Sequence, residues 1–282
     1  MSRLNKSKQS IWKVEENQIT RKKDVLATEE PLEILLRAGD EQKTFAITMR
    51  TPGSDYDLAA GFLYSEGVIR SKDDFTNMTY CVDDKQQEYN SLRVQLTVDS
   101  MPHLHQFERH IFTNSACGVC GTTMLDDLSQ RNIPTIPSGP IVEPSLITSL
   151  PDKLRQSQAL FDTTGGLHAA ALFDLDGNLL AVREDVGRHN ALDKLIGWGL
   201  LNDQIPFHNK ILLVSGRASY EILQKSYVAG VPIFCAVSAP SSLAVDVAER
   251  FGITLIGFLR GNRFNVYTGI ERIQATEPAL TN

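Results

Sequence analysis

The chain has few cysteines, no long apolar run and no excess of positive charge. Its 282 residues include four cysteines, and no apolar stretch approaches the roughly 20 residues that a membrane-spanning helix needs. The first part of the chain is polar and lacks the apolar centre of a signal peptide. The net charge of −6 argues against broad binding to nucleic acid or to an anionic membrane. We therefore expect a cytoplasmic protein that binds any anionic partner at a local site.

The apolar content predicts a folded protein with a substantial core. Hydrophobic residues make up 42% of the chain, and the length suggests about two domains. In a reducing cytoplasm the cysteines are not expected to form a disulfide framework, so a close pair indicates catalysis or metal binding. Cys81 and Cys235 lie in strand-like, apolar surroundings, which are typical of inert buried cysteines.

Composition divides the chain into five segments. Residues 1–22 are charged and poor in apolar side chains, which predicts a flexible N-terminal arm. A smaller α+β domain is expected over residues 23–132, and it ends with a Cys-x-x-Cys loop and a short helix. The proline-rich residues 133–140 predict a linker. Residues 141–274 predict a larger α/β domain, and residues 275–282 a tail.

The first domain begins with strand and helix signals. Residues 32–36 and 44–48 predict two strands around a turn. A helix is expected from Asp57 to Glu66 and should end at Gly67. Residues 90–98 alternate between apolar and polar side chains, which is typical of a half-buried strand.

The second domain alternates between strands and helices. Asp176 and Gly177 separate the two strands of an antiparallel hairpin. Helices then separate three further strands, which indicates parallel pairing with helices on both faces of the sheet. We therefore expect a three-layer α/β/α domain with a mixed sheet. The expected elements are hairpin strands 167–173 and 179–183, strands 211–214, 231–237 and 253–258, and helices 191–200, 219–228 and 243–250.

Polar loops follow the carboxyl ends of the predicted parallel strands, where ligands bind in such sheets. These loops combine small residues, hydroxyl groups and arginines, which suit phosphate. The arginines are Arg183, Arg188, Arg217, Arg260 and Arg263. A solvated polar loop explains any one of them equally well, but the convergence of four loops favours a nucleotide-like ligand. The chain has neither a P-loop nor a strict Gly-x-Gly-x-x-Gly after a strand, which argues against a standard ATPase or dinucleotide dehydrogenase.

The remaining cysteines, Cys117 and Cys120, form a Cys-x-x-Cys pair between small residues. A capping box at Thr123 predicts that a short helix follows, and the N-terminus of a helix lowers the pKa of a nearby thiol. The pair could carry sulfur, exchange disulfides or supply half of a metal site. One pair gives only two of the four ligands that structural zinc usually requires, so His110 or His168 would have to complete such a site.

Two specific cysteine chemistries fit the surrounding sequence poorly. Zinc deaminases need His-x-Glu together with Pro-Cys-x-x-Cys, whereas Ala116 precedes the pair here and no histidine is followed by glutamate at that spacing. Thioredoxin-type exchange normally uses a pair between a strand and a helix of a small βαβ fold, and the glycine-rich context of this pair differs.

Five blocks of sequence together resemble the FdhD/NarQ family over about residues 25–272. The blocks are residues 51–67, 117–121, 165–168, 184–194 and 215–217. The resemblance implies an accessory sulfurtransferase that moves sulfur from a cysteine desulfurase to the molybdenum cofactor of formate dehydrogenase. It also implies a homodimer and a C-terminal domain of cytidine-deaminase-like fold without deaminase activity, in agreement with the missing catalytic glutamate.

The same resemblance implies roles for individual residues. Cys117 would carry the persulfide, and Cys120 would assist its transfer or release. The acceptor would be a molybdenum bis(molybdopterin guanine dinucleotide) cofactor, and no tightly bound protein metal is expected. The guanine nucleotide part would lie near six residues, Phe258, Leu259, Arg260, Gly261, Asn262 and Arg263.

Several readings stay open at this point. A chaperone that only binds the cofactor, with incidental cysteines, is one alternative, and a zinc-dependent nucleotide hydrolase is another. His168 and His189 could be structural or could face the ligand. Asp185 is expected to orient neighbouring groups, and Asp193 is expected to be a solvated helical charge.

Overall fold

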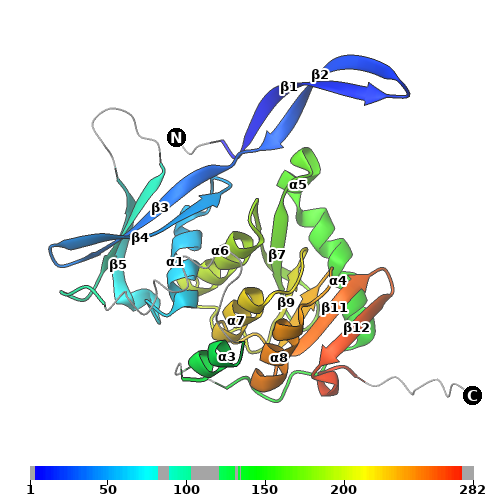
Figure 1. Cartoon of the computed structure of the whole chain (residues 1–282). Helices are drawn as coiled ribbons and strands as arrows, with labels where there is room; N and C mark the ends of the chain where they lie inside the picture. The colour runs from blue at the N-terminus through cyan, green and yellow to red at the C-terminus, as the bar shows by residue number, and fades with distance from the viewer. Residues whose placement is uncertain (1–3, 82–88, 103–120, 131–132, 134, 275–282) are drawn as a thin grey trace, which may run out of the picture.

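The structure is a computed structural model that describes residues 4–81, 89–102, 121–130, 133 and 135–274. Within these residues the strands form a two-stranded hairpin, a four-stranded sheet and a six-stranded sheet. The hairpin projects away from the two larger sheets, and helices cover both of these (Figure 1). The chain is therefore built from a projecting arm and two sheet-based units.

The arm consists of β1 (Lys6–Glu15) and β2 (Gln18–Ala27), which pair antiparallel along their whole length. The turn residues Glu16 and Asn17 have φ values of +46° and +67°, as the favoured two-residue hairpin turn requires. The structure adds a paired hairpin to the arm predicted for residues 1–22, and the flexibility of that arm stays a prediction. Low apolar content argues against a core, but it does not prevent cross-strand hydrogen bonds, which hold this hairpin together.

One four-stranded sheet and one long helix form the N-terminal unit. Its elements are β3 (Glu30–Ala38), β4 (Glu41–Arg50), α1 (Asp55–Glu66), a 3-10 helix (Lys72–Asp74), β5 (Phe75–Tyr80) and β6 (Ser91–Leu96). The strand order is β4-β3-β6-β5, with β3 and β6 parallel. Leu58 and Leu63 of α1 pack in one core with Ile34 of β3. The predicted strands and helix are confirmed, including the end at Gly67, which has a left-handed φ of +83°.

The six-stranded sheet and its helices form the C-terminal unit. Its elements are α4 (Pro144–Ser157), α5 (Ala159–Thr164), β7 (His168–Phe173), β8 (Leu179–Asp185), α6 (Arg188–Leu201), β9 (Ile211–Val214), α7 (Tyr220–Val228), β10 (Ile233–Ala236), α8 (Ser242–Phe251), β11 (Thr254–Arg260), β12 (Arg263–Thr268) and a 3-10 helix (Ile270–Arg272). The strand order is β12-β11-β10-β9-β7-β8. The central strands β9, β10 and β11 are parallel, and the flanking pairs are antiparallel. This confirms the predicted hairpin and parallel strands, and adds β12.

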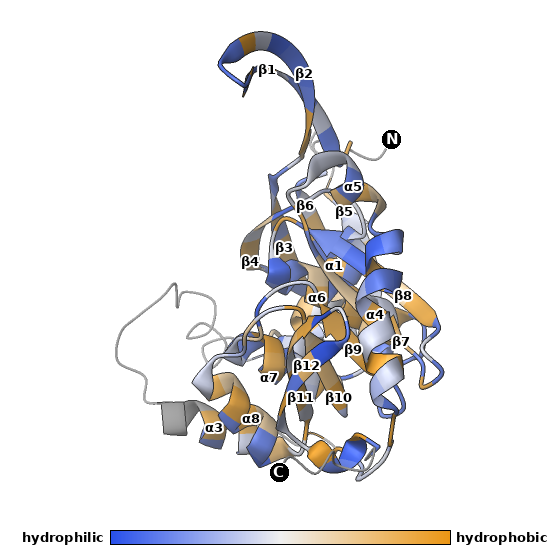
Figure 2. Cartoon of the chain, turned by 90° about the vertical axis from the view of Figure 1, so that its right-hand side faces the viewer, coloured by the Kyte–Doolittle hydropathy of each residue, from blue (hydrophilic) through white to orange (hydrophobic). Residues whose placement is uncertain are grey.

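Helices cover both faces of this sheet. Helices α6, α7 and α8 contribute to the core on one face, and α4 contributes to the core on the other. Figure 2 shows α4 on the opposite side of the sheet from α7 and α8. The mixed α/β class is confirmed, whereas the cytidine-deaminase-like detail and the domain boundaries stay predictions.

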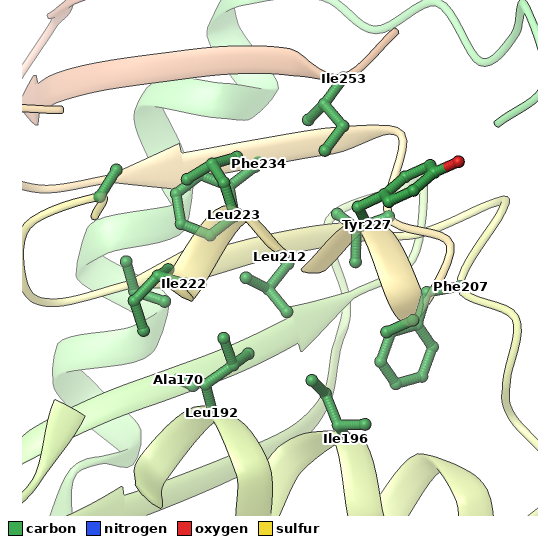
Figure 3. Packing of buried hydrophobic residues seen from close by; sticks show 14 of the residues in the cluster. Ala170, Leu192, Ile196, Phe207, Leu212, Ile222, Leu223, Tyr227, Phe234 and Ile253 are labelled. Atoms are coloured by element: carbon green, nitrogen blue, oxygen red, sulfur yellow. The ribbon is translucent and has the colours of Figure 1, made fainter. Parts of the chain in front are cut away.

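Strand β7 contributes to both cores through alternate residues. Ala170 and Leu172 belong to the core beneath α6 to α8, and Ala171 and Phe173 belong to the core beneath α4. Figure 3 shows Ala170 beside Leu192 of α6. The short, continuously apolar strands of this unit are buried on both faces, as central strands of three-layer folds usually are.

Helices α1 and α6 join the two units through an exceptionally close crossing. A Cβ atom on Gly61 would lie 2.7 Å from the backbone nitrogen of Gly197, and one on Gly197 would lie 2.7 Å from the backbone nitrogen of Gly61. Each would also fall on a carbonyl oxygen of the facing helix, that of Asp193 or Asp57. Only glycine fits at either position without moving the helices apart.

Helix α3 (Gly121–Gln130) packs on the C-terminal unit. Leu128 of this helix is buried in the same core as Ile136 and the residues of α6 to α8. Arg250 of α8 pairs with Asp126 at 2.8 Å. In the sequence this helix precedes the predicted linker. Its side chains nevertheless pack against the C-terminal unit, which follows the linker. Among the described helices, none is both long and apolar enough to cross a membrane.

Candidate functional site

Loops that follow the three parallel strands meet at one edge of the six-stranded sheet. Ala218, after β9, donates its backbone N–H to the carbonyl of Ala239, after β10, at 3.2 Å. Phe258, near the end of β11, donates its N–H to the carbonyl of Ser238 at 3.1 Å. The predicted convergence of these loops is therefore confirmed.

The loop after β8 reaches the same edge. A Cβ atom on Gly216 would lie 3.5 Å from Nδ1 of His168 and 3.8 Å from Cδ of Arg188, the first residue of α6. These are ordinary van der Waals distances, so the loop after β9 lies directly against both residues. The fourth loop therefore reaches the site, as the sequence predicted.

A pocket of about 770 Å³ opens beside these loops, a size that suits an organic ligand. Helices α4 and α5 form one wall, and the start of β7 and the ends of β9 and β10 form the other. The lining residues are Pro151, Asp152, Leu154, Arg155, Gln158, Phe161, Gly165, Gly166, Leu167, His168, Ser215 and Val237. The pocket thus lies at the edge of the sheet where the sequence predicted a ligand.

The residues expected to contact a guanine nucleotide lie at the end of β11 and in its turn to β12. Arg260 and Arg263 pair across this turn, in which Gly261 has a left-handed φ of +53°. Nε of Arg260 donates to the carbonyl of Val237 at 3.2 Å, which fixes the guanidinium beside the pocket. Leu259 is buried in the core beneath α4 and supports the strand instead.

Phe258 and Asn262 are exposed at this end of the sheet. Phe258 has a φ of +52°, a conformation that bulky residues rarely adopt and that costs about 1–3 kcal/mol. The strand is irregular here, because its pairing with β12 shifts between Gly257 and Arg260. The irregularity turns the ring of Phe258 outward, where it is available to stack on a ligand.

Not all of the arginines predicted to surround the site are available to bind a ligand there. Nε of Arg183 lies 2.8 Å from Oδ2 of Asp57 in α1, so this arginine joins the two units and is not free for an anion. That part of the prediction is wrong, because burial against the N-terminal unit could not be read from the loop. Arg188 and Arg217 lie at the predicted edge, and Arg217 is exposed.

The two histidines at this edge differ in their surroundings. His168 lines the pocket, and burial together with the charge of Arg188 lowers its pKa. His189 lies 3.1 Å from the carboxylate of Glu221 and 3.5 Å from the hydroxyl of Ser219. Burial, followed by the charge of Arg188, lowers the pKa of His189 to about 4. Both imidazoles are therefore neutral at neutral pH, and only that of His168 faces the pocket.

Asp185 orients the loop that leads into α6, as expected. Its carboxylate accepts hydrogen bonds from the backbone of Thr51 at 3.0 Å and of Gly187 at 2.8 Å. It also pairs with the buried Lys194 at 2.7 Å. Lys194 in turn donates to the carbonyl of Thr51 at 2.8 Å. This cluster holds the N-terminal unit against the loop beside the pocket.

Asp193 is buried, which corrects the expectation of a solvated charge. Each of its carboxylate oxygens lies 2.9 Å from Nζ of Lys225 in α7, and Ser65 of α1 donates to it at 3.1 Å. Glu66 lies 3.7 Å from the same ammonium group. Burial raises the pKa of Asp193 to about 6, against the opposing attraction of Lys225. The helical position suggested exposure, but α1 and α7 cover this face of α6.

Cys117 and Cys120 lie outside the described residues. Helix α3 begins at Gly121, directly after Cys120 in the sequence, so the helix predicted behind the pair is confirmed. Cys235 is fully buried, and burial raises the pKa of its thiol, as expected for an inert cysteine. Cys81 is half-buried. In the described part of the chain, no cluster of three or more His, Cys, Asp or Glu could hold a metal ion.

The wall formed by α4 and α5 was missed by the sequence analysis. Arg155 lies over the ring of Phe161 at 4.6 Å and pairs with Asp162 at 3.0 Å. The buried residues Ile147 and Leu154 are two helical turns apart, and Pro144 begins the helix, so the periodicity contains a signal for α4. No motif distinguishes the lining residues themselves.

Comparison with known proteins identifies the family of this chain. Residues 27–274 match the FdhD/NarQ family. The chain belongs to this family. It is 48% identical over 271 residues to the sulfur carrier protein FdhD of Streptomyces coelicolor, covering 94% of this chain and 95% of that protein. It is 50% identical over 250 residues to the sulfur carrier protein FdhD of Sulfurisphaera tokodaii, covering 89% of this chain and 92% of that protein.

One solved structure shares the fold of this FdhD/NarQ family member. A crystal structure from Desulfotalea psychrophila, described as that of a formate dehydrogenase accessory protein, aligns with a TM-score of 0.74. The alignment covers 96% of this chain and all of that one, at 24% sequence identity. At this identity the likeness supports the arrangement of elements and nothing finer.

Proposed function

We propose that this chain is a sulfur carrier in the maturation of formate dehydrogenase, acting in the cytoplasm. Sequence identity of about half to proteins of that name, over more than nine-tenths of the chain, carries the proposal. The pocket at the carboxyl edge of the sheet supports it, because Arg155 lines this pocket and Arg260 is bonded to Val237 at its rim, and guanidinium groups suit a phosphate-rich ligand.

The proposed reaction begins with the thiolate of Cys117. It attacks the outer sulfur of a persulfide on a cysteine desulfurase, so the sulfur–sulfur bond there breaks and the desulfurase cysteine leaves as a thiolate. Cys117 then carries the persulfide. In the second step the outer sulfur bonds to the molybdenum centre of a bis(molybdopterin guanine dinucleotide) substrate, and Cys117 leaves as a thiolate. The metal supplies the two electrons that convert the transferred sulfur to a sulfido ligand.

The described residues would bind and orient that substrate. The guanidinium of Arg260, held beside Val237, would pair with phosphate oxygens, and the outward ring of Phe258 would stack on the guanine base. The neutral imidazole of His168 would donate or accept a hydrogen bond in the pocket without adding positive charge. Cys120 would assist transfer or release.

Replacing Cys117 with alanine is expected to abolish both persulfide loading and activation of formate dehydrogenase, because no sulfur is left at that position to accept the transfer. Loading is measured after incubation with desulfurase and cysteine, and activation is measured with the purified apoenzyme. Cys81→Ala is the matched control and should retain both. Full activation by the Cys117 variant would favour a chaperone that binds the cofactor without carrying sulfur.

Replacing Arg260 with alanine is expected to weaken the binding of GDP roughly 10- to 100-fold, because a hydrogen bond to a charged group contributes about 1.5–3 kcal/mol. Isothermal titration calorimetry on the full chain measures this affinity. Arg250→Ala is the matched control, since Arg250 pairs with Asp126 on α3 and is not one of the pocket-lining residues. Equal GDP affinity of Arg260→Ala and the unchanged protein would contradict the assignment of residues 258–263.

A further inference from the structure

One buried residue in the wall of the pocket has a polar side chain without a partner. Gln158 is 5% exposed and lines the pocket. Its backbone N–H donates to the carbonyl of Arg155, and its own carbonyl accepts the N–H of Asp162. Its side-chain amide makes no hydrogen bond within the described residues. Because buried polar groups are nearly always paired, this amide indicates that a ligand in the pocket supplies the partner.

The backbone around Gln158 is fixed from two sides. This residue ends α4 and caps the start of α5. The carboxylate of Glu184 in β8 accepts hydrogen bonds from the N–H groups of Leu160 at 3.1 Å and Phe161 at 2.9 Å. These bonds tie the first turn of α5 to the sheet. Gln158 is therefore held in the wall before a ligand arrives, which lowers the entropic cost of binding.

Two further polar groups of the pocket are also uncharged. The hydroxyl oxygen of Ser215 accepts the N–H of Ala169 at 2.9 Å, which leaves the hydroxyl proton for a ligand. Burial, followed by the charge of Arg188, lowers the pKa of His168, so its imidazole is neutral at neutral pH. Leu154 and Leu167, which are both buried, line the same pocket. Apolar walls with a few precisely placed polar groups are typical of sites for organic ligands.

The charged residues that line the pocket are exposed and have opposite signs. Asp152 is exposed, and its carboxylate disfavours an anion. The side chain of Arg155 is 54% exposed and already pairs with Asp162 at 3.0 Å. The guanidinium of Arg260 lies at the rim, where it donates to the carbonyl of Val237. The phosphates of a ligand are therefore expected at the rim, and an uncharged part of the ligand is expected inside.

We propose that Gln158 recognises a planar, uncharged ring of the ligand through a ring N–H that lies next to a ring carbonyl. A side-chain amide offers one acceptor and one donor side by side, so it pairs with this edge through two hydrogen bonds. Guanine and pterin both have such an edge. The substrate of the proposed function contains both rings, so the identity of the ring rests on that function. The apolar walls would cover the faces of the ring.

Binding of the two isolated rings to the full chain tests the proposal. 6-Hydroxymethylpterin is titrated by its fluorescence and guanosine by calorimetry, and neither carries a phosphate for Arg260. We expect at least one of them to bind, and Gln158→Leu to weaken that binding about 10-fold or more, because two hydrogen bonds are lost. The ring that binds identifies the part of the substrate that enters the pocket. Absence of binding by both rings would overturn the proposal.

Two controls make the expected loss specific. Gln204→Leu is the matched variant, because its amide donates to the carbonyl of Asn202 and it does not line the pocket. This variant should bind the rings like the unchanged chain. If guanosine binds, guanosine methylated at ring nitrogen N1 should bind at least about 10-fold more weakly, because the methyl group removes the N–H. Equal affinity of Gln158→Leu and the unchanged chain would contradict recognition by this amide.

Chemical denaturation separates recognition from a structural role of the same residue. The amide has no partner to lose within the described structure, so Gln158→Leu should leave the free energy of unfolding unchanged or raise it. A clear loss of stability would assign the amide to the fold and would overturn the proposal. Persulfide loading of Cys117 is measured separately on the unchanged chain. Failed loading would count against sulfur transfer and would leave the result for ring binding unaffected.

Discussion

Replacing Gly197 with alanine is expected to lower the free energy of unfolding by about 3 kcal/mol or more, near the upper end of the effect of overpacking. The added methyl would lie 2.7 Å from the backbone nitrogen of Gly61 and would overlap the carbonyl oxygen of Asp57. Both obstacles are backbone atoms of α1, so no side chain can rotate out of the way. The gain of about 1 kcal/mol in helix propensity does not compensate.

The opposing glycine provides a stringent test of this explanation. Gly61→Ala should destabilise the chain similarly, because its methyl would overlap α6 in the same crossing. Once one methyl has separated the helices, the second should cost much less, so the double variant should be more stable than the sum of the two changes predicts. Gly166→Ala is the matched control, because its Cβ would meet only the carbonyl oxygen of Thr164, at an ordinary contact distance of 3.9 Å. Chemical denaturation measures all four variants, and additive losses would contradict a shared contact.

Replacing Lys225 with methionine is expected to cost about 3–5 kcal/mol at neutral pH, because the change leaves uncompensated charge in the interior. Burial alone would lower the pKa of Lys225, but the carboxylates of Asp193 and Glu66 raise it above its ordinary value. The ammonium group is therefore charged and holds α1, α6 and α7 together. Without it, two carboxylates face each other in the core, and Oε2 of Glu66 has no hydrogen-bond partner in the described structure.

The loss caused by this substitution should depend on pH. Burial already raises the pKa of Asp193 to about 6, and removal of the neighbouring cation raises it further. A carboxyl group whose pKa is higher in the folded than in the unfolded state takes up its proton at a higher pH in the folded state. Protonation in this pH range therefore favours folding. The variant should therefore recover stability as the pH falls from 7 towards about 4, the unfolded pKa. Addition of Asp193→Asn should restore part of the stability at neutral pH. A deficit that stays constant with pH would contradict the role of these charges.

Most elements of the two sheets could be predicted because local and global signals agree in them. Gly67 and Gly252 end helices in left-handed conformations that glycine adopts readily, and Asp176 with Gly177 separates the strands β7 and β8. The convergence of polar loops follows from parallel pairing alone, since the carboxyl ends of parallel strands share one edge. The position of the pocket was therefore accessible from the sequence.

Properties that depend on contacts between distant segments were not accessible. Asp193 and Arg183 have the sequence context of exposed charges, but α1 covers both positions and gives each a partner. The hairpin in the arm was not predicted, because cross-strand hydrogen bonds pair its strands and composition does not reveal them. The wall of α4 and α5 is recognisable as helix by periodicity, but its place beside the pocket is a result of tertiary packing.

The most direct test of the account is the mass of the Cys117 peptide after the chain is incubated with a cysteine desulfurase and cysteine. We expect this peptide to gain the mass of one sulfur atom, to lose it on treatment with a thiol reductant, and to retain it on Cys117 in fragments that separate Cys117 from Cys120. A peptide that gains no sulfur, or a gain confined to the Cys81 peptide, would contradict sulfur transfer through Cys117.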